Sequence, residues 1–557
     1  MRVVAGQIGA CQVAGHGGRD IARGAHRPAA VRGEGFQRRS GQKRVRQRTR
    51  LGGLAEGFVG ALDIGTSSVR ALLYDTDAHV VPGVEVHLPY QPKVGRDGTY
   101  EVDAGKLFGL VTSLLDGLLH EAGPRRRRRL LAVGVSTFWH GLVACSDRGS
   151  PLTPLYLWAD TRSWRQAERL RLELDAERLH QRTGCLLHPT YWPAKLAWLK
   201  DVRPELWSRP VRWLSFWDLV HWRLFGEPRT SVSMASGTGL LKLDDGSWDA
   251  ALLKHLEVDS RSLAELGVAG DRLGHQWAVR WPDLRGVPIL CAFGDGALAN
   301  LGSGCVDRRQ RALTVGTSGA LRVLARGLPQ RIPDGLWCYR LDAARSVTGG
   351  ALSNGGNLYA WLAANLNLEI GTLEGRLRRM PPGGHGLTFL PLLAGERSPG
   401  FASHATGAIA GLTQATTAND IVRAGLEAVA IEFHRVDQRL DQALPGARRL
   451  IANGAGLLAS PAWMQIMADA IGKPVAESKA REASSRGAAV MALEHAGVLN
   501  GDKLPTEVGR TYRAKAAARP VYELQTRKQE ALYDALIRRQ VLDGILKPKG
   551  PATGGKR

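Results

Sequence analysis

The stretch ALDIGTSSVRALLYD, residues 61–75, constrains the fold more than any other part of the chain. One apolar run ends at Asp63, a Gly-Thr-Ser-Ser segment follows, and a second apolar run covers residues 69–74. Two apolar runs joined by a short polar segment that contains glycine predict a β-hairpin with a tight turn.

The predicted turn has the chemistry of a phosphate-binding nest. Its glycine and three hydroxyl residues offer backbone N–H groups and short side-chain donors, which can hold phosphate oxygens. Asp63, beside the turn, is placed to orient Mg²⁺ through water, because this ion keeps several waters and takes one or two carboxylates. An ordinary turn is the alternative for this stretch alone. The candidate phosphate contacts are Gly65, Thr66, Ser67 and Ser68.

A second stretch, residues 312–324, repeats the pattern of strand, Gly-Thr-Ser turn and strand. Two such hairpins predict two similar half-molecules that face each other across a nucleotide, which is the arrangement of the actin-like ATPase fold. Between them, Asp295 stands between two glycines at the end of an apolar run, a good position for a carboxylate that approaches a substrate hydroxyl. The second set of candidate phosphate contacts is Gly316, Thr317, Ser318 and Gly319.

Seven motifs, taken in order, resemble those of the FGGY family of carbohydrate kinases. They occupy residues 63–68, 158–162, 294–296, 315–319, 349–356, 393–399 and 453–456. Within the family the gluconate kinases are the most similar, on residues 158–163, 182–184, 188–189, 195, 294–302 and 394–399.

This resemblance implies an α/β fold of two actin-like (ribonuclease H-like) ATPase domains that flank an interdomain cleft. The implied parts are a basic extension, a sugar-binding domain with the first phosphate hairpin, an ATP-binding domain and a basic tail. Their bounds are residues 1–56, 57–304, 305–546 and 547–557. The extension and the tail lack apolar periodicity, so we expect both to be disordered. The extension can also be upstream sequence from a wrongly chosen start codon, which peptides from residues 2–50 of the native protein would contradict.

The resemblance also implies the reaction. The γ-phosphoryl group of ATP would pass to a hydroxyl of a small sugar or sugar acid, above all the 6-hydroxyl of D-gluconate, to give 6-phosphogluconate. Asp295 would take or orient the hydroxyl proton, and Asp63 would position Mg²⁺. The implied substrate contacts are Trp139, His140, Gly141, Asp160, Arg162 and Asp295. The implied ATP contacts beyond the two turns are Asn354, Gly454, Ala455 and Gly456.

Some of these assignments have a structural alternative. His140 can be a satisfied histidine at a strand end. Asp160 and Arg162 can form a local ion pair, worth about 0–1 kcal/mol if exposed. Lys195 is a candidate for a second carboxylate partner, with an ordinary position on a helix surface as its alternative.

Two further segments of the family pattern are less informative. We expect Glu396 and Arg397 to be structural first and functional second. After Gly456 the sequence departs from the family pattern, which leaves the individual adenosine contacts open.

Rival functions remain at this stage. A kinase for xylulose or for another ketose or polyol keeps the mechanism and changes the substrate. An actin-like ATPase that senses a partner would hydrolyse ATP without phosphorylating a sugar. The candidate residues of the substrate pocket argue against this function. We do not expect a P-loop kinase, because no Gly-Lys-Ser/Thr loop of the required spacing is evident.

The formal net charge is +23, of which residues 1–56 carry +9, with twelve Lys or Arg against three Asp or Glu. A basic balance suits ATP and a sugar acid. It also suits nucleic acid, but that partner would rest on charge alone and we do not expect it. An arginine-rich proteome is the plainer explanation.

The six cysteines form no C-x-x-C pair, which predicts free thiols in a reducing cytoplasm. No apolar stretch is long enough to span a membrane, so we expect a cytoplasmic protein. The sequence does not fix the oligomeric state, and a homodimer stays open.

Further elements follow from periodicity and end signals. The expected strands are residues 80–90, 130–136, 387–393 and 450–452, and the expected helices are 103–121, 357–367, 419–440, 488–495 and 524–546. Residues 125–129, five arginines, are expected to be a solvated loop, and residues 245–285 a small peripheral helical insertion.

Overall fold

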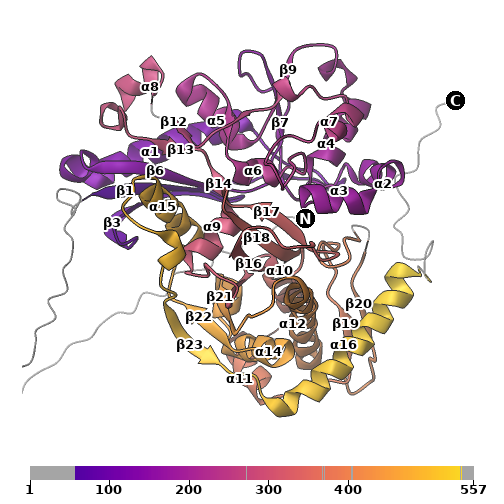
Figure 1. Ribbon diagram of the computed structural model, residues 1–557. Coiled ribbons are helices and arrows are strands. Elements are labelled where there is room, and N and C mark those ends of the chain that lie inside the picture. Colours follow the sequence, from indigo (N-terminus) through magenta and orange to yellow (C-terminus); the bar gives the residue numbers. More distant parts are fainter. Residues whose placement is uncertain are drawn as a thin grey trace, which may run out of the picture. The chain divides into compact units, whose positions relative to one another are not determined.

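The computed structural model describes residues 57–541, except 271, 367, 369, 403, 404 and 540 (Figure 1). The predictions of a disordered extension at 1–56 and of a disordered tail at 547–557 lie outside the described residues. No helix in the described part of the chain is long and apolar enough to cross a membrane.

The first half of the chain is built on a seven-stranded sheet in the order β12-β13-β6-β1-β2-β3, with β14 also paired to β6. The strands are β1 (Phe58–Ile64), β2 (Ser68–Tyr74), β3 (Val80–Pro89), β6 (Leu130–Thr137), β12 (Ala269–Gly270), β13 (Ile289–Leu290) and β14 (Phe293–Gly294). β1 and β2 form the predicted first hairpin, in which Asp63 pairs with Arg70. The N–H of Gly65 donates to the carbonyl of Ser68 at 2.9 Å and closes the turn.

The second half is built on another seven-stranded sheet, in the order β17-β18-β16-β15-β21-β22-β23. The strands are β15 (Gln310–Val315), β16 (Gly319–Arg326), β17 (Trp337–Arg340), β18 (Arg345–Leu352), β21 (Arg449–Asn453), β22 (Val475–Ser478) and β23 (Val508–Tyr512). β15 and β16 are antiparallel and form the predicted second hairpin.

The two sheets repeat one arrangement. In the first, β1 is antiparallel to β2, β2 is antiparallel to β3, and β6 lies parallel to β1 on the other side. In the second, β15, β16, β18 and β21 take the same places with the same directions. The prediction of two similar half-molecules of the actin-like type is confirmed.

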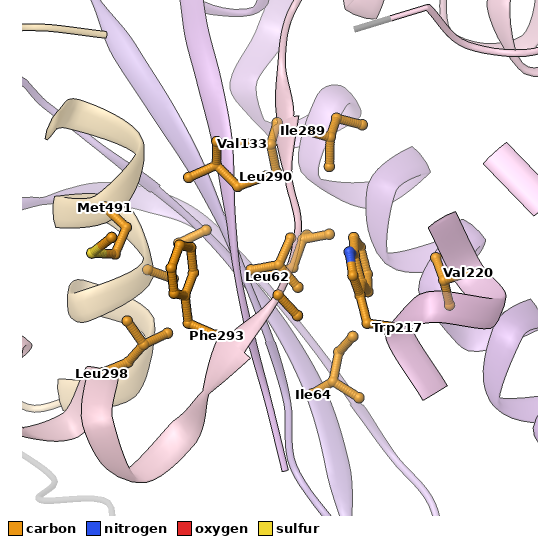
Figure 2. Packing of buried hydrophobic residues seen from close by; sticks show 14 of the residues in the cluster. Leu62, Ile64, Val133, Trp217, Val220, Ile289, Leu290, Phe293, Leu298 and Met491 are labelled. Carbon is orange, nitrogen blue, oxygen red and sulfur yellow. The ribbon is translucent and has the colours of Figure 1, made fainter. Parts of the chain in front are cut away.

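The first sheet is covered on both faces. α15 (Ala483–His495) and α9 (Asp295–Gly302) pack together and against β6, and α15 also packs on β1. Figure 2 shows Met491 of α15 and Leu298 of α9 on one side of the strands, and Trp217 and Val220 of α5 (Phe216–Phe225) on the other. A helix encoded late in the chain therefore completes the core of the first sheet.

α1 (Ala104–Arg127) packs on β1, β2 and β3 and begins where predicted, because the Asp103 side chain accepts from the N–H of Lys106 at 2.9 Å. It runs further than expected. Gly123, with φ 68°, kinks the helix, which then continues through Pro124 to Arg127. The prediction that residues 125–129 are a loop is therefore wrong for the first three arginines, because a proline can open the new helical turn.

The first half carries smaller elements around the sheet. They are β4 (Lys93–Val94), β5 (Tyr100–Val102), β7 (Val143–Ser146), β8 (Leu155–Tyr156), β9 (Val211–Leu214), β10 (Arg229–Thr230), β11 (Glu265–Leu266), α2 (Trp164–Glu173), α3 (Ala176–Thr183), α4 (Trp192–Val202), α6 (Val232–Ser236), α7 (Ala250–His255) and α8 (His275–Arg280). The segment at 245–285 is not wholly helical or peripheral, since β12 pairs with β13 in the main sheet.

The second sheet is packed by α12 and α14, with α10 against α12. The helices and the remaining strands are α10 (Gly356–Asn365), α11 (Ile370–Arg379), α12 (Ala418–Ala443), α13 (Ala455–Leu458), α14 (Pro461–Ile471), α16 (Arg519–Tyr533), β19 (Thr388–Leu390) and β20 (Ala408–Ala410). Expected helices and strands are present with shifted ends. β19 is shorter than predicted, α15 begins five residues earlier, at Ala483, and α16 gives way to a wider π-turn at Asp534–Arg538.

The five cysteines in the described part of the chain are buried and free, as predicted for them.

Candidate active site

A cavity of about 360 Å³ lies where the second hairpin, the start of α9 and the segment after β6 meet. Eight of the predicted site residues line it: Thr66, Trp139, His140, Asp295, Gly316, Thr317, Ser318 and Gly319. Residues from both halves of the chain thus converge on one cavity, as expected for a cleft between the two ATPase-like halves.

Asp295 is the first residue of α9, directly after β14. Its Oδ1 accepts the N–H of Gly296 at 2.7 Å. Burial raises the pKa of Asp295, while Arg322, the Gly296 N–H and Arg397 act in the opposite direction. A carboxylate of raised basicity at the cavity wall is suited to accept a proton from a substrate hydroxyl.

The glycines beside Asp295 make room for Trp139. A Cβ at Gly294 would lie 1.8 Å from the Trp139 ring, and one at Gly296 would lie 2.8 Å from it. A Cβ at Gly237 would lie 2.4 Å from the same ring. The indole N–H of Trp139 donates to the carbonyl of Ser233 at 3.0 Å. The two glycines of the Gly-Asp-Gly motif therefore leave room for the Trp139 ring on either side of Asp295.

His140 has a positive φ of 69° and lies beside Tyr191, with ring centroids 4.9 Å apart. Its Nδ1 lies 2.6 Å from the carbonyl of Gly237. Burial lowers the pKa of His140 to about 3, and Lys195 and Arg397 add to this effect. The ring is therefore neutral, Nδ1–H donates to Gly237, and Nε2 is left as an acceptor for a substrate hydroxyl.

The turn of the second hairpin is braced from behind. The N–H of Gly356 donates to the carbonyl of Gly316 at 2.8 Å, and that of Asn357 donates to Thr317 at 3.0 Å. Gly454, with φ 90°, approaches so closely that a Cβ there would lie 2.4 Å from the carbonyl oxygen of Val315. The predicted ATP residues of the Gly454–Gly456 segment lie behind this turn, outside the cavity lining.

The turn of the first hairpin contributes Thr66 to the cavity, whereas Gly65, Ser67 and Ser68 lie outside its lining. Its backbone is held by Tyr90, whose hydroxyl donates to the carbonyl of Gly65 at 2.5 Å. The hydroxyl side chain of Ser67 is left exposed at the tip.

Asp63 sits at the end of β1, opposite Ser136 of β6. Burial raises its pKa to about 6, and the carboxylates of Asp295 and Glu482 act in the same direction. Among the described residues no ion pair holds Asp63, and no group of three or more acidic, His or Cys side chains is arranged to hold a metal. A single hard carboxylate beside the turn of the first hairpin fits Mg²⁺ that is held mainly by phosphate oxygens and water.

Asp160 and Arg162 do not line the cavity. The Arg162 guanidinium binds Asp160 at 2.6 Å and Glu101 at 2.6 Å, and it stacks on Trp198 at 4.8 Å. Asp160 also accepts the N–H of Tyr100 at 3.1 Å. These contacts are those of the local ion pair named above as the alternative, and they hold the turn that carries Trp158 into the cavity wall. Gly141 is buried, and it too lies outside the cavity lining.

Lys195 is 1% exposed and points at backbone rather than at the cavity. Its Nζ donates to the carbonyl of Thr190 at 2.6 Å and to that of His140 at 3.0 Å. Burial lowers its pKa to about 7. Its contacts are those of a group that holds two cavity segments together.

Two arginines in the cavity lining were not among the predicted site residues: Arg322 was not singled out, and Arg397 was expected to be structural first and functional second. Arg322 donates to Asn300 at 3.1 Å and to Thr314 at 2.8 Å, and Arg397 lies over the Trp158 ring at 4.5 Å. The sequence did carry a signal for Arg322, because this residue lies inside the apolar strand β16. Burying a charge in such a strand is costly, so an arginine there indicates a partner or a function. For Arg397, whose motif was interpreted as structural, no local signal separates the two roles.

Two similar hairpins, and a cavity with one carboxylate between two actin-like halves, are typical of the class of two-lobed sugar kinases. The chain belongs to the FGGY family of carbohydrate kinases: the model of its N-terminal domain matches residues 58–302 and that of its C-terminal domain matches residues 312–495. The protein is therefore a phosphotransferase that acts on a carbohydrate.

The similar proteins include kinases named for different sugars. A gluconokinase of Bacillus subtilis (strain 168) is 29% identical over 470 residues, 81% of this chain and 90% of that protein. A xylulose kinase of Streptomyces rubiginosus is 31% identical over 491 residues, 86% of this chain and 95% of that protein. The crystal structure of a gluconate kinase from Lactobacillus acidophilus has the same fold, with a TM-score of 0.79 and 23% identity over 86% of this chain and 98% of that one.

Proposed function

We propose that the protein transfers the γ-phosphoryl group of ATP to the 6-hydroxyl of D-gluconate. The observation that carries this proposal is the charge of the cavity. Among the described residues that line it, Asp295 carries the one carboxylate, whereas Arg322 and Arg397 carry guanidinium groups. Burial lowers the pKa of Arg397 only to about 10, so it stays charged at neutral pH. Two guanidinium groups allow one of them, Arg322, to face the phosphates of ATP and leave Arg397 for the carboxylate of an acid.

The residues divide into three roles. Asp295 would take the proton of the attacking hydroxyl. Arg322, which bonds Thr314 just before the turn of the second hairpin, would neutralise charge on the phosphoryl group in transfer. The two turns would position the phosphates, and Mg²⁺, when bound near Asp63, supplies charge neutralisation.

The proposal agrees with the match to a gluconokinase, and the match to a xylulose kinase supplies the rival substrate. The test is ADP release by the purified protein with gluconate, xylulose, ribulose, glycerol or no sugar. We expect gluconate to give strong ADP release. ³¹P NMR should identify the product as a 6-phosphate. A response to xylulose alone would replace the substrate, and ADP release without any sugar would favour an ATPase that senses a partner.

Asp295→Asn tests the base. The amide keeps the shape of the side chain and cannot accept the proton, so we expect turnover to fall by about 10²- to 10⁴-fold. ATP binding, followed by calorimetric titration, should stay close to wild type. Asp77→Asn, at an exposed aspartate on the β2–β3 turn, is the matched control and should retain full turnover. Turnover close to wild type in Asp295→Asn would remove Asp295 from this role.

A further inference from the structure

We propose that Arg397 binds the carboxylate of the substrate and thereby selects a sugar acid over a neutral polyol of the same length. This assignment rests on the proposed function, since it needs an acid as the substrate. It names one residue, Arg397, in place of Lys195, the candidate carboxylate partner of the sequence analysis.

The contacts of Arg397 leave it ready for an anion. One Nη donates to the carbonyl of Leu352 at 3.0 Å, and the guanidinium carbon lies over the Trp158 ring, 4.5 Å from the ring centre. Its Nε is buried and has no hydrogen-bond partner among the described residues. No ion pair of Arg397 is found in the described part of the chain either. A half-buried guanidinium with an unpartnered Nε and no counter-ion among the described residues favours a carboxylate, which it can bind through two parallel hydrogen bonds.

The loop that carries Arg397 is held rigidly. The neighbouring Glu396 accepts the Tyr533 hydroxyl at 2.6 Å and the N–H of Gly400 at 3.0 Å. Asn354 bonds the backbone of residues 394 and 395, at 3.0 and 3.1 Å. The N–H of Ser398 donates to Ala351 at 2.9 Å. A guanidinium on such a loop is pre-organised, so little ordering is needed when a ligand binds.

The other cations near the cavity are already engaged. Arg162 is held by two carboxylates, and Lys195 by two backbone carbonyls. Arg322 bonds Asn300 and Thr314 and therefore lies on the phosphate side.

Arg397 lies on the sugar side. Its guanidinium lies over the ring of Trp158, and both residues line the cavity together with His140, a predicted substrate contact. A substrate that spans Asp295 and Arg397 would place its acceptor hydroxyl at one end and its carboxylate at the other.

The test compares two substrates that differ at one carbon. D-Gluconate and D-glucitol share their remaining carbons, but the first ends in a carboxylate and the second in a hydroxymethyl group. Steady-state kinetics of full-length wild type and Arg397→Gln are measured with both. We expect the KM for gluconate to rise by about 10- to 100-fold in the variant, because a charge-assisted pair is lost. The kcat/KM for glucitol should stay within about threefold, since no charge pair is lost with that substrate.

Two further variants guard the result. Arg397→Lys keeps the charge and loses the planar fork, so its KM for gluconate should fall between those of the wild type and Arg397→Gln. Arg309→Gln removes one positive charge from an arginine whose side chain is 72% exposed. This variant should change the kinetics with neither substrate. Circular dichroism and thermal melts of all four proteins identify a variant that does not fold, in which case Arg397→Lys decides.

The outcomes separate the two proposals. Wild type that prefers gluconate, together with an Arg397→Gln variant that keeps this preference, would overturn the assignment of Arg397 and leave the function standing. Wild type that phosphorylates a neutral sugar and ignores gluconate would overturn both. Equal losses with gluconate and glucitol would show that Arg397 supports the loop rather than the carboxylate, and would also overturn the assignment.

Discussion

Lys195 shows how a residue can serve the site without entering it. A buried ammonium group that bonds only backbone carbonyls lacks a counter-charge, so burial lowers its pKa to about 7 from an ordinary value of 10.5. The carbonyls belong to Thr190 and to His140, whose backbone has a positive φ. Lys195 thus fixes a backbone conformation that most side chains disfavour.

This geometry predicts a pH effect on stability. Between pH 7 and about 10 the unfolded chain binds a proton at Lys195 that the folded chain has lost, so the free energy of unfolding should rise with pH. The slope is at most about 1.4 kcal/mol per pH unit. Urea unfolding of the wild type and of Lys195→Met, followed by fluorescence at several pH values, measures it. The difference between the two curves should carry the rise, because all other groups titrate in both proteins.

A pH-independent difference would contradict the prediction and would show that Lys195 is charged in the folded protein throughout this range. The slope decides, not the absolute stability, since Lys195→Met also leaves two carbonyls without their donor.

Single residues of the site were predictable where their neighbours in sequence carry the signal. Asp295 was found because glycines flank it, although the reason for the glycines, the Trp139 ring, comes from a segment remote in sequence. The ring nitrogen partner of His140 and the backbone partners of Lys195 depend on chain crossings that no local pattern encodes. Arg397 depends on Trp158 in the same way.

At the scale of elements, the two hairpins were predictable because each is short, local and bounded by a glycine turn. The packing of α15 on α9 was not. It is set by glycines that let two helix backbones touch: a Cβ at Gly302 would lie 1.9 Å from the carbonyl oxygen of Ala483 and 2.6 Å from the nitrogen of Gly487. Contact between backbones leaves no side chain that could move aside, so such a site is intolerant of even one methyl group.

Gly302→Ala should therefore destabilise the protein by about 1–3 kcal/mol or more. Since α9 begins at Asp295, turnover should fall as well. Gly109→Ala in α1 is the matched control, because a Cβ there meets nothing within 4 Å. In that helix alanine should stabilise by about 0.5–1 kcal/mol. Chemical unfolding measures the free energy of unfolding of both variants. Equal effects of the two substitutions would contradict the backbone contact at Gly302.

At the scale of the whole molecule, the chain order and the packing order differ. The sequence boundary between the halves was placed at residues 304 and 305, and it stays a prediction. α15 nevertheless follows most of the second half in sequence and packs on β1, β6 and α9 of the first. Arg486 at its start donates to the carbonyls of Ala78 at 3.1 Å and of Gly302 at 3.0 Å. Arg70 binds Glu482 at 2.6 Å and adds a second tie.

These ties predict that the first half cannot fold without α15. A fragment of residues 57–304 would expose the strand face that Val490 and Leu493 bury, and apolar surface of that size favours aggregation over folding. We expect it to aggregate or to lack a cooperative thermal transition, whereas the full chain should unfold in one calorimetric transition. Joining residues 478–500 to the fragment through a flexible linker restores the missing face and should restore cooperative unfolding. A fragment of residues 57–304 that folds by itself, or two separate transitions in the full chain, would mean that each sheet is stable without the other half.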